Sequence, residues 1–584
     1  VVMNRKNLTA AVLAGLAGAA GIVGSAQAVN INPDGLGQLL IYPYYTVNAG
    51  NQTVLSVVNT SDEAKAVKVR FLEGENSREV LDFNLYMSAY DVWTAAIYDD
   101  AGTPTLVTND TSCTVPYLYE MGPQPFLKWR LNDSIFLDGD GEYDDISRAS
   151  EGHFEMIEMG MLTNESTYDN PDYDPEDKDS EPLLSYNSAK AATHKDGVPA
   201  NCDQLVEAWT RSASGNGYWI PDVGDEPLID MSAPSGGLFG GAAIVNVADG
   251  MMFSYDAKAI NGFADSVSKD DDTSDMLHQE PGTILPSLDS GGRYDAYVFE
   301  DDGMSLASVA LSRGVDAVSY VFMHDNIMNE YTTEAAVNAG TEWVITFPTK
   351  QFYVHQDFLN DIADFRDNGK LDGSVEESDL EAPVAPFTDD WVWVETTYND
   401  DDTVKKAGYV DRPCERVEYL IYDREEGVPA DEPPGPDRPP VVSPAPPPEE
   451  ETPEPTFSLC FETQVVSFGG DEADEGDLEI NPLTDEEMTA ILGSSNFTNI
   501  NNTVLGFEYG WMNLDMVNYR EDSLSPRIAR DPLDNLFGLP VTGFAVQAFE
   551  NGFLGEGAST LANYGGIFQH KGTTSSVPVS APTL

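Results

Sequence analysis

Apolar and polar residues alternate cleanly in the stretch from residue 64 to residue 71. Val67, Val69 and Phe71 alternate there with Lys68 and Arg70. Successive side chains of a β-strand point to opposite faces, so this period of two predicts a strand with one apolar and one polar face.

Similar short stretches recur along the chain, rich in aromatic and β-branched residues and bounded by turn residues. Residues 248–250 predict the turn of a hairpin. Short strands at this spacing predict a mainly β fold of immunoglobulin-like β-sandwich domains. The expected strands are 38–47, 52–59, 64–71, 81–85, a run beginning at 92, 154–162, 236–247, 251–255, 293–299, 317–322, 342–347, 352–355, 391–397, 415–423 and 457–468.

A few short covering helices are expected beside these strands. Asn201 is a helix-capping residue type, and it precedes an apolar stripe that predicts a helix to Ser212. The capping box at 484–487 predicts a second helix over 488–492 that ends at Gly493.

The N-terminal residues have the pattern of an export signal. Arg5 and Lys6 precede an apolar run over 8–23, and Ala26-Gln27-Ala28 follows it. A basic region, a short apolar region and an A-x-A site predict a secretory signal peptide over 1–28, with the mature chain starting at Val29. No later apolar stretch reaches membrane-spanning length. We therefore expect an extracellular or outer-surface protein.

The four cysteines are Cys113, Cys202, Cys414 and Cys460. An even number in an exported chain favours two disulfides over free buried thiols. Three connectivities are open, and the pairs Cys113–Cys202 and Cys414–Cys460 are favoured because each closes a local loop.

The second pair brackets a Pro-rich, acidic segment at 429–455. This segment is interpreted as a long loop in a disulfide-closed hairpin, with an interdomain linker as the alternative. The expected organisation is a signal peptide (1–28), an N-terminal β-sandwich (29–115), an acidic loop-rich insertion with a short helix (116–235), a β-rich middle domain (236–400) and a C-terminal β domain (401–584).

The charge of the chain is extreme, with 100 acidic against 30 basic residues and a formal net charge of −70. Such a chain lacks the cationic face that phosphate requires, which disfavours nucleic acid and anionic lipid as partners. The acids are spread along the whole chain, which favours adaptation to high salt. Extensive binding of divalent cations is the alternative.

One acidic loop has an ordered spacing of carboxylates and glycines. Hard oxygen ligands at such spacing can bind Ca²⁺, although Tyr143 stands where an EF-hand requires glycine. The alternative is a solvated acidic loop. The candidate calcium ligands are Asp138, Asp140, Glu142, Asp144 and Asp145.

Motifs for catalysis are missing from the sequence. It contains no H-E-x-x-H, no G-x-S-x-G, no Walker A and no G-x-G-x-x-G. Pairs of acids for glycoside hydrolysis occur everywhere in so acidic a chain and carry no signal. We therefore expect a non-enzymatic protein with no organic cofactor.

Several stretches resemble a group of exported, uncharacterised proteobacterial cell-surface proteins. The resemblance is patchy and implies a surface or extracellular role, without any assigned site residue. The stretches that carry it are 35–46, 67–74, 81–86, 338–350 and 563–571.

These features together predict a secreted structural protein that self-assembles into a filament, sheath or surface layer. An apolar strand just after the cleavage site is a candidate assembly strand, because such a strand can complete the sheet of a neighbouring copy. A Ca²⁺-dependent adhesin or glycan-binding module is the first alternative, and a secreted hydrolase is the second. The residues of the candidate assembly strand are Leu39, Ile41, Tyr42, Tyr44, Tyr45 and Val47.

Overall fold

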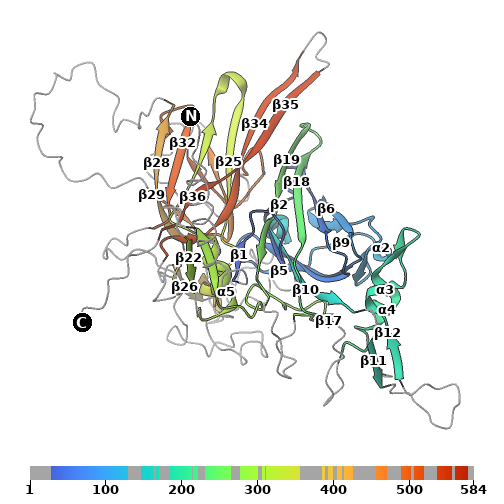
Figure 1. The fold of residues 1–584 in the computed structure, drawn as a ribbon. Helices are drawn as coiled ribbons and strands as arrows, with labels where there is room; N and C mark the ends of the chain where they lie inside the picture. The colour runs from blue at the N-terminus through green and yellow to red at the C-terminus, as the bar shows by residue number, and fades with distance from the viewer. Residues whose placement is uncertain are drawn as a thin grey trace, which may run out of the picture.

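The computed structural model places most of the chain in antiparallel β-sheets (Figure 1). It describes residues 28–128, 146–163, 166–169, 183–212, 215–220, 231–264, 277–299, 305–308, 311–355, 384–387, 392–398, 404–410, 414–424, 456–469, 488–500, 505–517, 536–554 and 560–575.

Two large sheets form the N-terminal half. The eight-stranded sheet runs β1 (Asn30–Ile31), β20 (Lys258–Asn261), β2 (Leu39–Thr46), β10 (Glu151–Leu162), β4 (Lys65–Glu73), β5 (Glu79–Met87) and β8 (Cys113–Val115), with β17 (Met231–Ser232) beside β10. The six-stranded sheet runs β19 (Met251–Asp256), β18 (Leu238–Asn246), β3 (Asn51–Asn59), β6 (Val92–Asp100), β7 (Thr103–Val107) and β9 (Gln124–Pro125).

Two five-stranded sheets form the C-terminal half. The outer sheet runs β29 (Thr456–Leu459), β28 (Glu415–Asp423), β32 (Tyr509–Asp515), β24 (Asn326–Thr332) and β36 (Lys571–Thr573). The inner sheet runs β31 (Phe497–Ile500), β30 (Thr463–Phe468), β25 (Ala339–Thr346), β34 (Thr542–Leu554) and β35 (Thr560–Gln569). The long β34–β35 hairpin projects away from the body (Figure 1).

Short elements surround these sheets. The two-stranded pairs are β11 (Ser166–Asp169) with β12 (Leu183–Tyr186), β13 (His194–Lys195) with β14 (Val198–Pro199), β15 (Arg211–Ser212) with β16 (Gly215–Asn216), β21 (Ala296–Phe299) with β22 (Ser305–Ser308), β23 (Met323–His324) with β33 (Leu539–Pro540), and β26 (Val392–Tyr398) with β27 (Val404–Val410). The helices are α2 (Leu118–Met121), α3 (Ser188–Ala192), α4 (Cys202–Glu207), α5 (Gly314–Phe322), α6 (Gln351–Val354) and the 3₁₀ turns η2 (Asn48–Gly50), η4 (Ile146–Ser150) and η6 (Ala335–Val337). None of these helices has the length and apolar character needed to cross a membrane.

The mainly β fold predicted from the alternating pattern is confirmed. Val67, Val69 and Phe71 point into the core between the eight- and six-stranded sheets, where they join residues such as Trp93. The hairpin at 248–250 is also present, because Asn246 pairs with Met251 across it. Strands β18 and β20, which fall inside the predicted segment 236–400, pair with strands of the segment 29–115.

The inner sheet packs on both of its faces. Trp343 and Ile345 lie in the core that this sheet shares with the outer sheet. Val344, between them in sequence, belongs with Phe544 to the core of the N-terminal half. Since successive side chains of a strand point to opposite faces, β25 connects two hydrophobic cores.

The polar face of β4 is buried as well. Lys65 pairs with Glu158 at 2.6 Å, and both side chains are fully buried. Arg70 pairs with Glu79 at 2.8 Å and also with Glu155. Buried charges of this kind are tolerated because each has an opposite charge within hydrogen-bonding distance.

Two predicted strands are helices instead. Residues 317–322 lie in α5, and residues 352–355 coincide with α6 and its C-cap. The Asp316 carboxylate accepts a hydrogen bond from the Arg313 amide at 3.0 Å and so stabilises the first turn of α5. Every residue of α5 is buried, and a short apolar run that is buried on all sides has no periodicity to separate helix from strand.

The predicted helix at 488–492 is a turn. Its donors point at the buried carboxylate of Glu342, which accepts hydrogen bonds from Thr489 Oγ1 at 2.9 Å, Ile491 N at 2.7 Å and Leu492 N at 2.9 Å. The backbone amides of Ile491 and Leu492, which would donate to carbonyls within a helix, thus donate to a carboxylate from another part of the chain. The helix predicted from Asn201 is present but ends at Glu207, because Arg211–Ser212 pairs as β15.

Candidate binding cavity and assembly edge

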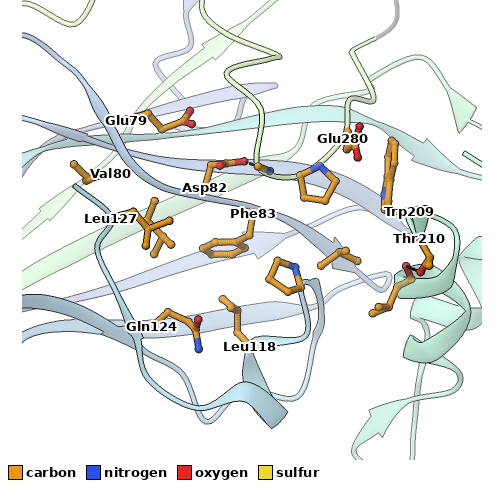
Figure 2. Close-up of a pocket in the computed structure, with 16 residues that line it drawn as sticks. Glu79, Val80, Asp82, Phe83, Leu118, Gln124, Leu127, Trp209, Thr210 and Glu280 are labelled. Carbon is orange, nitrogen blue, oxygen red and sulfur yellow. Dashed lines mark hydrogen bonds between the residues drawn. The ribbon is translucent and has the colours of Figure 1, made fainter. Parts of the chain in front are cut away.

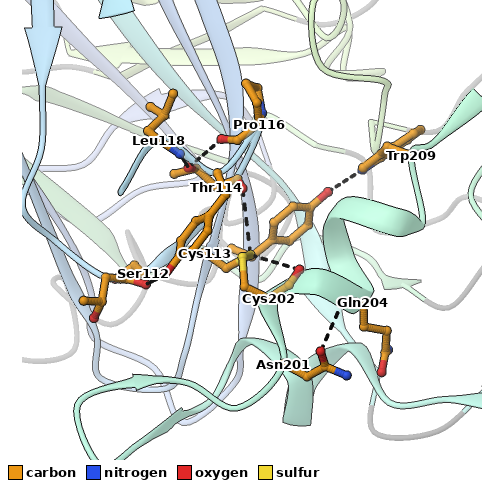
Figure 3. Close-up of a disulfide and its surroundings, with 12 residues drawn as sticks. Ser112, Cys113, Thr114, Pro116, Leu118, Asn201, Cys202, Gln204 and Trp209 are labelled. Atoms are coloured by element: carbon orange, nitrogen blue, oxygen red, sulfur yellow. Dashed lines mark hydrogen bonds between the residues drawn. A yellow bond between two sulfur atoms is a disulfide. The ribbon is translucent and has the colours of Figure 1, made fainter. Parts of the chain in front are cut away.

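Both favoured disulfides are present. Cys113 bonds to Cys202, which ties β8 to the start of α4 (Figure 3). Cys414 bonds to Cys460, and β28 pairs with β29 beside this bond. The two strands that flank the Pro-rich segment therefore form a disulfide-closed hairpin, while residues 429–455 themselves lie outside the described residues.

The candidate calcium ligands Asp138, Asp140, Glu142, Asp144 and Asp145 lie outside the described residues. Within the part of the chain that the structure describes, no three His, Cys, Asp or Glu side chains gather as a metal-binding group.

The candidate assembly strand is β2, and all eight of its residues are buried. It pairs with β10 on one side, and Leu39–Ile41 pair with β20 on the other. The apolar edge expected after the predicted cleavage site is therefore an interior strand of this chain. Leu39 and Ile41 face one core cluster, whereas Tyr42, Tyr44, Tyr45 and Val47 belong to the other.

A cavity of about 470 Å³ opens at the rim of the eight-stranded sheet (Figure 2). One wall is the part of β5 that precedes its pairing with β8, and the opposite wall comes from the end of α4 and the residues after it. The Cys113–Cys202 disulfide links β8, the strand that pairs with β5, to the start of α4. The lining residues are Glu79, Val80, Leu81, Asp82, Phe83, Val115, Pro116, Leu118, Gln124, Leu127, Val206, Trp209, Thr210, Glu280, Pro281 and Gly282.

The floor of the cavity is apolar. Phe83, Val115 and Leu118 are buried there, and Phe83 packs edge-on against Trp93 of the six-stranded sheet with 5.5 Å between ring centroids. The floor is thus the outer end of the sandwich core, held by close-packed rings. Apolar lining with a few placed polar groups is the usual composition of a small-ligand site.

Trp209 is fixed at one side of the cavity by aromatic neighbours. Its Nε1 donates a hydrogen bond to the hydroxyl of Tyr86 at 2.7 Å. Its ring lies 5.4 Å from that of Trp219 and 5.0 Å from that of His278, measured between centroids. Burial in this cluster lowers the pKa of His278 to about 3, so the imidazole is neutral at ordinary pH. The indole is therefore held in one orientation before any ligand arrives.

The three carboxylates that line the cavity each have a cationic partner. Glu79 pairs with Arg70, Asp82 pairs with Lys68, and Glu280 accepts two hydrogen bonds from Arg211. Burial lowers the pKa of Lys68, and the nearby Asp82 opposes that shift. The charges around the cavity largely cancel, in contrast to the rest of this acidic chain.

Two oxygen atoms at the cavity, Asp82 Oδ1 and Gln124 Oε1, accept no hydrogen bond from a described residue. Lys68 Nζ and the amide of Gly282 both bind the same oxygen of Asp82, Oδ2, and no described residue donates to Oδ1. The Asp82 side chain is nine-tenths buried. The amide nitrogen of Gln124 donates to the carbonyl of Gly122, whereas its Oε1 accepts from no described residue. Both oxygens can accept hydrogen bonds from a ligand.

Sequence reasoning did not find this cavity. Its residues come from five separate parts of the chain, and each is unremarkable in its local pattern. Trp209 falls within the helix predicted from Asn201 to Ser212, and Asp82 falls within the predicted strand 81–85. The feature of the sequence that could have indicated the cavity is the occurrence of Trp209 and Trp219 close together in a chain with only eight tryptophans.

A second feature is the uncharged edge of the inner sheet. β35 pairs as a strand with β34 and with no other described strand. Two side chains of other strands also bond to it, since Asn329 Nδ2 donates to the Phe568 carbonyl at 2.9 Å and Lys258 Nζ donates to Gln569 Oε1 at 3.0 Å. It contains no Asp, Glu, Lys or Arg, although more than a fifth of the chain is charged. Leu561, Tyr564 and Phe568 of β35 are exposed, as is Phe553 near the end of β34. We call this surface the β35 edge.

Comparison of the chain with protein-family models, with curated proteins and with solved structures found no match.

Proposed function

We propose that the chain is an exported structural protein of the cell exterior that self-assembles into a filament, sheath or surface layer. The observation that carries this proposal is the β35 edge. A long edge strand with exposed aromatic residues and no charge is a template for pairing with another strand, and soluble proteins ordinarily protect such edges with charge or proline. Here the edge carries neither.

The charge of the chain makes this edge the favourable place for contact between copies. Each copy carries a formal net charge of −70, so most pairs of surfaces repel one another. Pairing between two β35 edges brings no charged side chain of that strand into contact. Two antiparallel copies of β35 would exchange backbone hydrogen bonds and bury Tyr564 and Phe568.

Three further features support a place outside the cell. The predicted signal peptide would direct export, and two disulfides are compatible with an oxidising compartment. An acidic surface remains hydrated at high salt, where screening also weakens repulsion between copies.

Assembly is tested by light scattering and electron microscopy of chain 29–584 at low and high salt. We expect oligomers or polymers whose fraction rises with salt. Tyr564→Asp places a charge on the edge and should shift the population to monomers. Tyr294→Asp is the matched control, since Tyr294 is 50% exposed and Tyr564 is 56% exposed.

Monomers at all salt concentrations, or assembly that Tyr564→Asp leaves unchanged, would contradict the proposal. The same measurement with calcium and then with a chelator examines the loop at 138–145. Assembly that requires calcium would indicate that this loop takes part in the contact between copies. Assembly in both conditions would indicate that its acidic residues are hydrated and take no part in the contact.

A further inference from the structure

We propose that the cavity beside Trp209 binds a neutral saccharide, with one pyranose ring stacked on the indole. This inference is independent of the proposed assembly, because the cavity lies in the N-terminal half and the β35 edge belongs to the inner sheet. It rests on the orientation of Trp209, the charge balance of the walls and the two open acceptor oxygens.

The indole is suited to stacking because it is already immobilised. Its N–H is used by Tyr86, and Trp219 and His278 pack against it. Figure 2 shows the Trp209 ring edge-on, with one face turned toward the side of the cavity where Asp82 and Phe83 lie. A fixed aromatic face offers contact area to the apolar C–H face of a sugar without a cost in side-chain entropy.

The balance of charge selects a neutral ligand. An anion would meet a chain with a net charge of −70 and three carboxylates at the cavity itself. A cation would have to compete with Lys68, Arg70 and Arg211, which already pair with those carboxylates. A neutral ligand disturbs none of these ion pairs and so avoids leaving a buried charge without its partner.

The open oxygens require a ligand that donates hydrogen bonds. Oδ1 of Asp82 accepts no hydrogen bond from a described residue, and neither does Gln124 Oε1. Sugar hydroxyls are donors that can reach such oxygens while the ring contacts Trp209. A purely apolar ligand would seal off Asp82 Oδ1 from water without a replacement donor, which is unfavourable.

The cavity volume of about 470 Å³ lies within the usual range for small-ligand sites, about 300–1,000 Å³. The Cys113–Cys202 disulfide fixes α4 to β8, the strand that pairs with β5, so binding does not have to bring the two walls together. The site is open to solvent near Thr210 and Leu127, both of which are exposed. A chain end or one residue of a longer glycan could enter there.

The test is isothermal titration calorimetry of chain 29–584 with the neutral trisaccharides maltotriose and cellotriose. Trigalacturonate and tetramethylammonium serve as the anionic and cationic probes. Thr210→Tyr fills the mouth of the cavity without touching an ion pair, and Gln124→Ala removes one acceptor oxygen. Thr94→Tyr is the matched control, because Thr94 is an exposed threonine on β6 in the other sheet.

We expect saturable binding of at least one neutral trisaccharide, weakened about tenfold or more by Thr210→Tyr and several-fold by Gln124→Ala. Thr94→Tyr should bind as the wild type does, and circular dichroism should show all variants folded. The proposal is overturned if neither neutral sugar binds, if a charged probe binds in preference, or if Thr210→Tyr binds the sugar as tightly as the control. Thr210→Tyr should assemble normally, whatever the outcome for the sugar.

Discussion

Tyr255 stacks on Phe544, with 4.8 Å between ring centroids and 27° between ring planes. Tyr255 lies on β19 of the six-stranded sheet, and Phe544 lies on β34 of the inner sheet. The Tyr255 hydroxyl also donates a hydrogen bond to the carbonyl of Tyr44 on β2. This contact therefore joins the N-terminal sandwich to the C-terminal half inside one continuous core.

Truncation of this contact should destabilise both halves together. Phe544 is fully buried, so Phe544→Ala removes a large ring and leaves a cavity, with an expected loss of about 3–5 kcal/mol. Tyr255→Phe keeps the ring and loses the hydroxyl, with an expected loss of about 1 kcal/mol. Differential scanning calorimetry measures both changes. Phe553→Ala is the control, because Phe553 is 62% exposed and its truncation should move the transition little. An equal shift for Phe544→Ala and Phe553→Ala would show that the two halves do not depend on this contact.

The buried pair of Lys65 and Glu158 gives a second prediction. Glu158 also accepts hydrogen bonds from the amides of Ser235 at 3.0 Å and Gly236 at 2.7 Å. Lys65→Met leaves this carboxylate buried without its cation, which should cost about 3–5 kcal/mol. The double change Lys65→Met with Glu158→Gln removes the charge and keeps an acceptor for one of the two amides, so it should recover part of that loss.

Thermal unfolding of the single and double variants tests this coupling. Lys195→Met is the control, since Lys195 is exposed. A double variant that is no more stable than Lys65→Met alone would mean that the two charges are not energetically coupled.

Glu342 predicts a specific dependence of stability on pH. Burial raises its pKa from 4.5 to about 7, and the nearby Glu151 adds to that shift. A carboxyl group with a raised pKa binds more protons in the folded than in the unfolded protein. Its contribution to stability is therefore complete below about pH 4.5 and is lost as the pH rises through 7. The full difference is about 3 kcal/mol.

Thermal unfolding of wild type and Glu342→Gln between pH 4.5 and 8 measures this contribution. The stability of wild type relative to Glu342→Gln should fall as the pH rises, since the amide does not titrate. Glu330→Gln, at an exposed position, should track the wild type throughout. A constant offset between wild type and Glu342→Gln across this range would contradict the assignment.

The assembly strand illustrates how far the sequence could lead. The run over 38–47 was recognisable as a strand, and β2 covers Leu39–Thr46. Which strands lie beside it was not recognisable, because its partners β10 and β20 are more than a hundred residues away. Deletion of residues 29–47 would remove an interior strand. A loss of assembly in that truncation could therefore result from unfolding as well as from a missing contact between copies.

The sequence by itself determined the local features of this protein. Alternation at Val67, Val69 and Phe71 predicted a strand and the face that enters the core, and export chemistry with local loop closure favoured the two cysteine pairs that are bonded. These features depend on neighbouring residues and on the even number of cysteines.

Only the tertiary structure decided what covers the other face of that strand. Lys68 and Arg70 have the pattern of a solvated face, yet both are buried. Asp82 and Glu79 of the neighbouring strand β5 pair with them, and the distant strand β10 adds Glu155. The turn at 488–492, the buried helix α5 and the cavity beside Trp209 have the same cause. Each depends on partners that are remote in sequence, and a local pattern contains no information about which remote groups will satisfy its charges and hydrogen bonds.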